Sequence, residues 1–545
     1  MRDAVRLALA DAIGAGALPR PADDRPVEIQ RPANPEHGDY ATNLALQLAR
    51  PLRLAPPAIA AAIAEALARR GGVVGSAEAA GPGFVNVRLA DAALEGIVAR
   101  ARAAPERWGR PAADRPTAHV NVEFVSANPT GPLTVGNARG AFAGDLLARV
   151  IEAGGRLVTR EYYFNDSSAQ VRNLGASVIA QREARPIPDD GYHGDYVVAL
   201  AGALPDDLAT PRPGDDDETR AWAVGRWASG RIREGIEASL ERLGVRFDAW
   251  TTEGSLVADG WVEQAIGRLR DGGHLYEQDG ATWFRSTAFG DDKDRVVVRS
   301  NGELTYFAFD IGYVVQKFSR GFDHLIYIWG ADHHGTVARV RNAAEAMGYD
   351  KARVEMILTG WVHFVRDGVP FSMSKRAGTF ITLDELLAEL GVDAARWYFA
   401  SRGANVDMDV DIELARRQSS ENPVYYVQYA HARIASILRK AAESGLAPAA
   451  SIHGLLAEAP DALLARVVSR FPEVVEDAAA AQETQGLTTY ATELATAFHA
   501  YYRDARVVDP AEPERSARRL ALVDATRITL AGALGLLGIS APEAM

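Results

Sequence analysis

The sequence contains no cysteine among its 545 residues. This absence excludes disulfide bonds, thiolate zinc sites, iron–sulfur clusters and cysteine nucleophiles. Long apolar runs are also missing, because the longest uncharged one (residues 528–542) is shorter than the ~18 residues that a membrane span needs. The N-terminal stretch carries Asp3 and Asp11 within its apolar part, which is typical of a surface helix and not of a signal peptide. We therefore expect a soluble, cytoplasmic protein without membrane contact.

Basic residues are fewer than acidic residues in this sequence. The chain has 59 lysines and arginines against 72 aspartates and glutamates, a formal net charge of −13. A protein whose whole surface binds nucleic acid is normally basic, so this balance argues against indiscriminate polyanion binding. A local basic groove on an acidic body remains compatible with it. The sequence also shows no repeat of fixed period, which sets solenoids and propellers aside.

The chain is too long for one hydrophobic core, and its composition changes at two places. Residues 1–105 mix alanine-rich helical stretches with short strand patterns, and a Pro/Arg-rich linker follows at 104–116. Residues 115–405 begin with a strand, a glycine loop, a helix and a second strand, an order that predicts a parallel sheet. We expect an insertion in this part at about 165–300. Residues 415–545 are almost entirely helical and predict a separate all-α bundle. The fold class is therefore α/β, with an α+β domain before the parallel sheet.

The first candidate site is the loop SANPTGPLTVGNARG at residues 126–140. Gly131, Gly136 and Gly140 permit close backbone approach, and the following helix offers free N–H groups and a positive dipole end. That arrangement suits a nucleotide at the carboxyl edge of a parallel sheet. The loop matches neither the Walker nor the GxGxxG pattern. A tight strand-to-helix turn that needs its glycines explains the segment equally well.

The second candidate is SMSKRAG at residues 372–378, between a predicted hairpin and a helix that Thr382 and Glu385 begin as a capping box. Lys375 and Arg376 make this loop a cationic arm, which can neutralise charge on a leaving pyrophosphate. Taken alone, the segment is better explained as a solvated basic loop.

Together the two segments resemble the HIGH-type and KMSKS-type motifs of class I aminoacyl-tRNA synthetases. The resemblance to the arginyl-tRNA synthetases runs from end to end of the chain. Six segments carry it: NPEHGDYATNLALQLAR (34–50), VEFVSANPTGPLTVGNARG (122–140), EYYFNDSSAQVRNLG (161–175), GYHGDY (191–196), YFAFDIGYVVQKFSRGFDHLIYIWGADHHG (306–335) and RLALVDATRITLAGALGLLGISAPEAM (519–545). The resemblance implies a Rossmann-type catalytic domain with an insertion, an N-terminal domain that contacts tRNA and a C-terminal anticodon-binding bundle. It also implies an arginine–tRNA ligase that forms arginyl-adenylate from arginine and ATP, then transfers arginine to the 3′-terminal adenosine of tRNA(Arg).

Two departures from the family pattern stand in the motifs. Thr134 and Asn137 replace the HIGH histidines, and Ser372 replaces the first lysine of KMSK while Lys375 keeps the second. Threonine and asparagine donate hydrogen bonds but carry no imidazolium charge. A non-catalytic paralogue that binds tRNA or arginine is therefore an alternative. A small-molecule nucleotidyltransferase of the same fold is a second one, against which the N-terminal and C-terminal domains argue.

The resemblance implies roles for individual residues. Catalytic roles fall to Thr134, Asn137 and Lys375. The expected ATP-binding residues are Gly131, Pro132, Leu133, Gly136, Gly330, Asp332, Met373, Ser374 and Lys375. Magnesium is expected to arrive with ATP, because it prefers phosphate oxygens and water to a protein cage.

A guanidinium is a planar cation with five donors, so an arginine site needs acceptors and preferably a carboxylate. Tyr306 and Asp310 are spaced i, i+4 and so share one face of a predicted helix. The resemblance places both in the guanidinium pocket. It places Glu123 and Asn128 near the α-amino and carboxylate groups of the substrate arginine. It also places His333 among the residues that contact this substrate.

A metal site at Asp332, His333 and His334 is a further hypothesis. Adjacent histidines do not both face one ion from a regular strand or helix, and no third spaced histidine lies nearby. We therefore expect no protein-bound zinc.

The C-terminal part interleaves aromatic and basic residues, a pattern by which unpaired RNA bases are stacked. Packing in the bundle core is the alternative for about half of these aromatics. The tRNA-contacting residues that we expect, in both terminal domains, are Asn43, Tyr425, Tyr429, Arg433, Phe498 and Met545. The expected partners are tRNA(Arg), arginine and ATP, and the protein is expected to be a monomer.

Overall fold

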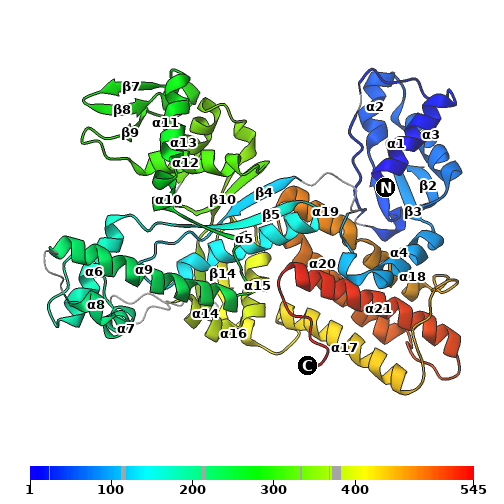
Figure 1. The fold of residues 1–545 in the computed structure, drawn as a ribbon. Helices are drawn as coiled ribbons and strands as arrows, with labels where there is room; N and C mark the ends of the chain where they lie inside the picture. The colour runs from blue at the N-terminus through cyan, green and yellow to red at the C-terminus, as the bar shows by residue number, and fades with distance from the viewer. Residues whose placement is uncertain are drawn as a thin grey trace.

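The computed structural model describes residues 1–23, 25–32, 34–111, 118–210, 216–331, 334–366, 369–370 and 382–545. Figure 1 shows an N-terminal unit, a central sheet surrounded by helices and a C-terminal helical bundle. Across the described ranges, none of the helices combines the length and apolarity needed to cross a membrane.

The N-terminal unit is an α+β domain, as the sequence predicts. Its antiparallel sheet has the order β1-β3-β2, with the helices α2 and α3 packed on it and α1 packed on α3. The helix α4 leads from the last strand to the C-terminal bundle, where it packs with α18 and α21. The bounds are α1 Arg2–Gly14, β1 Tyr40–Thr42, α2 Leu44–Leu52, α3 Pro56–Arg70, β2 Val74–Ala80, β3 Phe84–Leu89 and α4 Asp91–Ala103.

The central sheet confirms the predicted parallel α/β fold. Its strand order is β11-β10-β4-β5-β6, and each pairing is parallel. The bounds are β4 His119–Glu123, α5 Val135–Ala153, β5 Leu157–Phe164, β6 Ala249–Thr252, β10 His324–Gly330 and β11 Val354–Thr359. The chain runs outward from β4 through β5 to β6, then returns to β10 on the other side of β4. The carboxyl end of β4 is therefore a topological switch point, where α/β proteins bind ligands.

The stretch between β5 and β10 holds mostly helices. The bounds are α6 Ala169–Arg182, α7 Asp195–Ala203, α8 Asp206–Ala209, α9 Asp217–Arg242, α10 Glu253–Ala258, α11 Trp261–Asp271, β7 Leu275–Gln278, β8 Ala281–Phe284, β9 Arg295–Val298 and α12 Tyr306–Ser319. The strand β6 lies inside the range expected for the insertion but pairs with β5, so part of that range belongs to the parallel sheet. A Cβ on Gly225 of α9 would lie 2.1 Å from the Val171 carbonyl oxygen, so this glycine lets α9 approach α6 closely.

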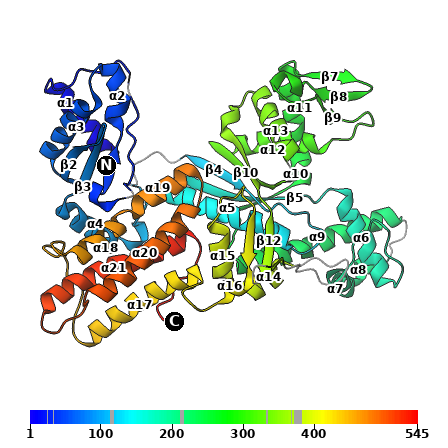
Figure 2. The same ribbon diagram turned by 180° about the vertical axis from the view of Figure 1, so that it is seen from behind.

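A three-stranded sheet with the order β13-β12-β14 follows β11. Its strand β12 is labelled in Figure 2. Its antiparallel β12–β13 pair is the predicted hairpin, and α14 begins with the predicted Thr382–Glu385 capping box. The bounds are α13 His334–Ala346, β12 Val362–Arg366, β13 Val369–Pro370, α14 Leu383–Leu390, α15 Val392–Ala400, β14 Met408–Asp411 and α16 Ile412–Arg416.

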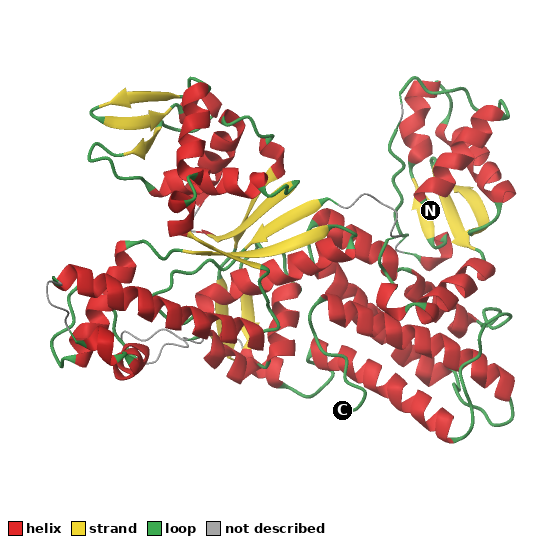
Figure 3. Ribbon diagram, viewed as in Figure 1, coloured by secondary structure: helices red, strands yellow, loops and turns green. Residues whose placement is uncertain are grey.

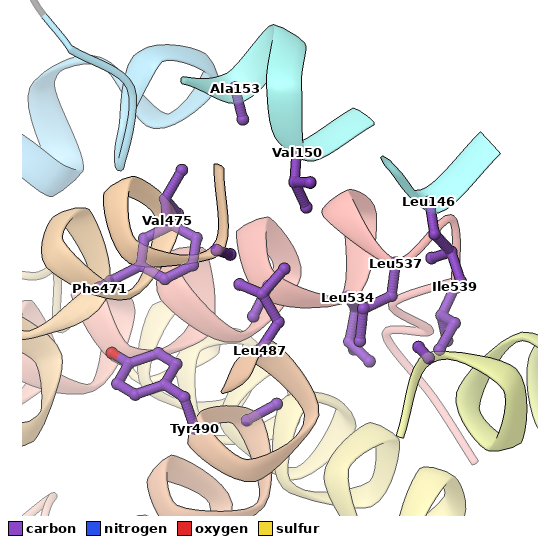
Figure 4. Close-up of a cluster of buried hydrophobic side chains, with 14 of the residues drawn as sticks. Leu146, Val150, Ala153, Phe471, Val475, Leu487, Tyr490, Leu534, Leu537 and Ile539 are labelled. Carbon is purple, nitrogen blue, oxygen red and sulfur yellow. The ribbon is translucent and has the colours of Figure 1, made fainter. Parts of the chain in front are cut away.

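The rest of the chain is helical, as predicted (Figure 3). The bounds are α17 Pro423–Glu443, α18 Ala459–Ser469, α19 Phe471–Ala481, α20 Gln485–Asp504 and α21 Pro513–Leu536. Figure 4 shows Leu146 and Val150 of α5 facing the bundle, where Leu534 and Leu537 lie beside them. The first helix of the central sheet and the bundle therefore share one hydrophobic core.

A buried arginine joins the same elements. Arg396 of α15 is fully buried, and its Nη1 lies 2.8 Å from Asp145 of α5. Its guanidinium also donates to the carbonyls of Leu243, just after α9, and Leu537, just after α21. The middle of α5 is thus tied to α15 and to the residues that follow α9 and α21.

Candidate functional site

The site begins at a strained turn after β4. Val125 and Ser126 have φ angles of 68° and 40°, in the left-handed region that β-branched residues in particular avoid. The Ser126 hydroxyl donates to Glu123 (3.1 Å) and accepts from the Tyr163 N–H (3.1 Å). These bonds hold the turn in place, and strain of this kind concentrates at functional sites.

The loop that follows lies against the helical insertion. The Ser229 hydroxyl donates to the Pro129 carbonyl (3.1 Å), and the Tyr196 hydroxyl donates to the Thr130 carbonyl (2.9 Å). Asn128 is exposed at the sheet edge, which leaves it accessible to a ligand. Among the expected ATP-binding residues, Gly131 and Pro132 are half-buried, while Leu133 is buried.

Thr134 and Asn137 bond to each other at the start of α5. Asn137 Oδ1 accepts from the Thr134 N–H (2.9 Å) and from its hydroxyl (3.0 Å), which makes a capping box. The Leu133 carbonyl accepts from the Leu383 N–H (2.8 Å), so the start of α5 is tied to the start of α14. Gly136 is exposed in the first turn and leaves the helix N-terminus open to an anion. Thr134 and Asn137, the two altered motif positions, thus fix the start of α5. The resemblance to the synthetases did not predict this role.

On the α12 side of the sheet lies a buried charge network. Lys317 of α12 is fully buried, with its Nζ 2.6 Å from Glu123. Glu161, also fully buried, accepts from Thr251 (2.6 Å), Tyr313 (2.7 Å) and Arg320 (2.7 Å). Two carboxylates and two cations are therefore close together here, with hydroxyl groups of Thr251 and Tyr313 bonded to Glu161.

The protonation equilibria of this network depend on its partners. Burial raises the pKa of Glu123 and lowers that of Lys317, so each relies on the other for its charge. Burial also raises the pKa of Glu161, but the charges of Lys317 and Arg320 outweigh it and lower that pKa overall. Loss of Lys317 would leave Glu123 buried without its compensating cation.

Asp310 stands one helical turn after Tyr306 on α12. Burial raises its pKa to about 7, and the negative charges of Glu123 and Glu253 add to the effect, with Arg339 opposing it. Within the described part of the chain, no hydrogen bond or ion pair engages the Asp310 carboxylate. Tyr306 is 67% exposed and so lies at the rim, while Asp310 lies deeper. The local surplus of negative charge suits a cationic ligand.

Glu253 is a second carboxylate here, which the sequence interpretation missed. It lies at the start of α10 directly after β6 and accepts from Tyr163 (2.9 Å), Asn165 (3.0 Å) and Ser167 (2.8 Å). The sequence could have indicated Glu253 only as an acidic residue at the end of a strand. The strand β6 has only four residues, so its alternation of apolar and polar residues is weak. Its closeness to Asp310 depends on the fold.

Several predicted residues lie outside the described part of the chain: Asp332, His333, Ser372, Met373, Ser374 and Lys375. Gly330 is described and half-buried at the end of β10, across the sheet edge from Thr359. The residues that the structure does describe include no group of three or more histidine, aspartate or glutamate side chains able to hold a metal ion.

In the bundle, part of the predicted RNA-binding set forms one surface cluster. Arg433 lies 4.4 Å from the ring of Tyr502 and 5.6 Å from that of Tyr429, and Tyr425 stacks with Tyr429. Phe498 differs from the expectation: it is fully buried, because its position on α20 faces the bundle core, so its ring offers no face to RNA.

The other two expected tRNA contacts lie elsewhere. Met545 is 53% exposed at the C-terminus. Asn43 precedes α2 in the N-terminal domain, half-buried, with its amide donating to Glu28 (3.2 Å).

Family models match three stretches of the chain. The arginyl-tRNA synthetase N-terminal domain matches residues 1–89, the class I (R) tRNA synthetase catalytic domain residues 214–430 and the DALR anticodon binding domain residues 427–545. They follow the order of the three parts seen in the structure.

Whole proteins match as well. An arginine–tRNA ligase of Citrifermentans bemidjiense is 44% identical over 531 residues, covering 95% of each chain. A Thermus thermophilus arginyl-tRNA synthetase structure is 25% identical, with a TM-score of 0.76 and full coverage of both chains. A Campylobacter jejuni structure assigned to the same enzyme is 32% identical with a TM-score of 0.76, covering 84% of this chain and 100% of the other. At this identity and coverage, the chain belongs to the arginyl-tRNA synthetases, class I ligases that join arginine to tRNA.

Proposed function

We propose that this chain activates arginine with ATP to give arginyl-adenylate and pyrophosphate, then transfers the arginyl group to the 3′-terminal adenosine of tRNA(Arg). The observation that carries the substrate choice is the Asp310 carboxylate, half-buried beside Glu253 and Glu123 and without a described cationic partner at hydrogen-bond distance. A guanidinium would supply the missing positive charge and donate to several oxygens at once.

Arginine would lie across the carboxyl edge of the sheet. Asp310 and Glu253 would face the guanidinium, with Tyr306 covering it at the rim. The α-amino and carboxylate groups would lie toward Glu123 and Asn128, near the Ser126 turn. Because Glu123 is paired with Lys317 (2.6 Å), its orientation would be fixed before the substrate arrives. Pre-positioning of this kind lowers the entropic part of the barrier.

ATP would lie at the start of α5, with its triphosphate toward the helix N-terminus. Gly131, Pro132, Leu133, Gly136 and Gly330 would contact the nucleotide, and so would Asp332, Met373 and Ser374. Thr134 and Asn137 supply no charge there, so Lys375, and Mg²⁺ bound to ATP, would neutralise the charge that develops on the leaving pyrophosphate. His333 would add a polar contact to the substrate.

The terminal domains would hold the tRNA. The surface cluster of Tyr425, Tyr429, Arg433 and Tyr502 offers aromatic faces beside a cation, which suits unpaired anticodon bases. Asn43 would contact the tRNA from the N-terminal domain, and Met545 from the C-terminus. We further propose that the protein acts as a monomer in the cytoplasm.

One assay tests this function directly. Purified protein is incubated with total tRNA, ATP and each radiolabelled amino acid in turn, and arginine alone should be attached. Arginine-dependent ATP–pyrophosphate exchange with cognate tRNA present then tests the activation step. A flat exchange trace from well-folded protein would contradict the proposal and favour a non-catalytic paralogue, a reading that the comparisons do not support.

A further inference from the structure

The segment GDY at residues 38–40 is part of the resemblance to the synthetases, yet it holds none of the residues proposed to bind arginine, ATP or tRNA. It leads into the strand β1. Gly38 has a φ angle of 99°, and a Cβ there would lie 2.7 Å from the Val87 carbonyl oxygen of β3. Glycine is therefore required for the chain to approach β3 so closely. The next two side chains, Asp39 and Tyr40, both reach the C-terminal bundle.

The Asp39 carboxylate bonds to two domains at once. Its Oδ2 accepts from the Leu89 N–H at the end of β3 (2.7 Å), and its Oδ1 accepts from Nε of Arg466 near the end of α18 (2.9 Å). The side chain of Asp39 is 8% exposed, so solvent screens this ion pair less than it would a surface pair. One carboxylate thus ties the N-terminal sheet directly to the bundle.

Tyr40 makes the second connection. Its hydroxyl donates to Glu473 in the first turn of α19 (2.5 Å) and accepts from Arg31 (3.0 Å), which also pairs with Glu473. The Arg31 guanidinium lies 4.5 Å from the centre of the Tyr40 ring. Burial raises the pKa of Tyr40 well above its usual value, and the charge of Glu473 adds to this effect while Arg31 opposes it. The hydroxyl therefore keeps the proton that it donates across the domain boundary.

The helix α19 also packs against α5 of the central sheet. Figure 4 shows Val475 of α19 in the same cluster as Val150 and Ala153 of α5. A Cβ on Gly154, directly after α5, would lie 2.6 Å from the Ala479 Cβ, so the two helices approach closely. Through its first turn α19 therefore contacts the N-terminal domain, and through its later residues it contacts the first helix of the central sheet.

We propose that Asp39 and Tyr40 are positioning residues, which fix the N-terminal domain against α18 and α19 at one distance and orientation relative to the bundle. The proposal rests on the proposed function, because that function gives one tRNA contacts in both domains. Two contact sites at a fixed spacing bind a stiff ligand more tightly than either site alone, because the second contact forms at a high effective concentration. An N-terminal domain that moved freely would lose part of this gain.

Distance measurements test the fixation itself. The chain contains no cysteine, so spin labels can be attached at two exposed positions, Glu65→Cys on α3 and Lys440→Cys on α17, without a competing thiol. Pulsed electron–electron double resonance should then give one narrow distance distribution. Adding Glu473→Ala removes the acceptor of Tyr40 and the counter-charge of Arg31, and the distribution should broaden. An equally narrow distribution would overturn the proposal.

Aminoacylation kinetics of the unlabelled protein test the consequence. Glu473→Ala should raise the tRNA KM roughly 10-fold through the lost effective concentration, while kcat and the arginine KM at saturating tRNA stay unchanged. Glu473→Gln keeps an acceptor for Tyr40 and should restore part of the loss. Tyr40→Phe should also raise the tRNA KM but add little to Glu473→Ala, because both changes remove the same contact. An arginine KM that rises as much as the tRNA KM would overturn the positioning role.

Arg70→Gln is the matched control, because the Arg70–Asp11 pair that it breaks lies within the N-terminal domain and crosses no boundary. It should change neither the distance distribution nor the tRNA KM. Effects as large as those of Glu473→Ala would overturn the assignment to the domain boundary. Failure of the proposed function would look different, because the unmodified protein would then charge no tRNA while its distance distribution remained narrow.

Discussion

The two sides of β4 handle charge in opposite ways. Toward α12, Glu123, Glu161, Lys317 and Arg320 are mostly buried ionic groups held by short hydrogen bonds. Toward α5, the helix start at which we propose that phosphate binds is fixed by the neutral Thr134–Asn137 pair. The proposed amino-acid side thus has fixed charge in a desolvated setting, which favours selectivity. The helix start on the proposed nucleotide side offers geometry and a helix dipole, so charge there would come from other groups.

Breaking the buried pair on the charged side should have the largest effect. Lys317→Met keeps the length of the side chain but leaves Glu123 buried without a cation. We expect a loss of about 3–5 kcal/mol in the free energy of unfolding, because an uncompensated buried charge is costly. Denaturant unfolding measures it. The control is Lys351→Met, which breaks the exposed Lys351–Glu345 pair (2.7 Å) and should cost about 0–1 kcal/mol. Equal losses of stability in the two variants would show that the buried pair contributes no more than an exposed one.

Removing charge from the substrate pocket should impair arginine binding and leave the fold intact. Asp310→Asn keeps the shape of the side chain, but the guanidinium would lose its principal counter-charge. The arginine KM should rise by about two orders of magnitude or more, as for a desolvated cation left unpaired. The ATP KM should barely change. Steady-state aminoacylation at varied arginine and varied ATP separates the two, and a parallel rise in both constants would place Asp310 outside the arginine pocket.

The pH dependence of kcat/KM for arginine also tests the role of the Asp310 carboxylate. The pKa of Asp310 is about 7 in the free protein, so its carboxyl becomes protonated as the pH falls through that value. kcat/KM for arginine should therefore fall below pH 7, where the attraction to the guanidinium is lost. The Asp310→Asn variant should lack this limb of the profile. Because the pKa is raised on folding, Asp310 contributes stability at low pH that is lost as the pH rises toward 7. A profile unchanged by the substitution would assign the limb to another group.

The smallest change in stability is expected at the start of α5, where the neutral Thr134–Asn137 pair lies. Asn137→Ala removes the acceptor that caps Thr134 and should cost about 1 kcal/mol in the free energy of unfolding. It should lower the rate of ATP–pyrophosphate exchange and leave the arginine KM unchanged. Asn137→Asp is the matched variant, because it keeps an acceptor for the cap but places a negative charge at the phosphate site. It should retain stability and slow ATP–pyrophosphate exchange further. A normal exchange rate in this variant would show that ATP does not bind at this helix start.

Local features of the fold could be predicted from the sequence. The Thr382–Glu385 capping box, the β12–β13 hairpin and the buried strand around Glu123 all follow from short patterns of residues. The Thr134–Asn137 cap is also local, and its Thr-x-x-Asn spacing was available as a signal. The pairing of Glu123 with Lys317 joins residues far apart in the chain, and the approach of Glu253 to Asp310 depends on strand order. No periodicity encodes such contacts, so they required the structure.

We propose that the carboxylates around Asp310, and not shape alone, select arginine. The most direct measurement compares arginine with citrulline, its neutral isostere, as substrates for aminoacylation by the unmodified protein. Arginine should be preferred in kcat/KM by two orders of magnitude or more, because citrulline leaves the carboxylates unpaired. Comparable charging with the two amino acids would show that shape, and not the carboxylates, selects the substrate.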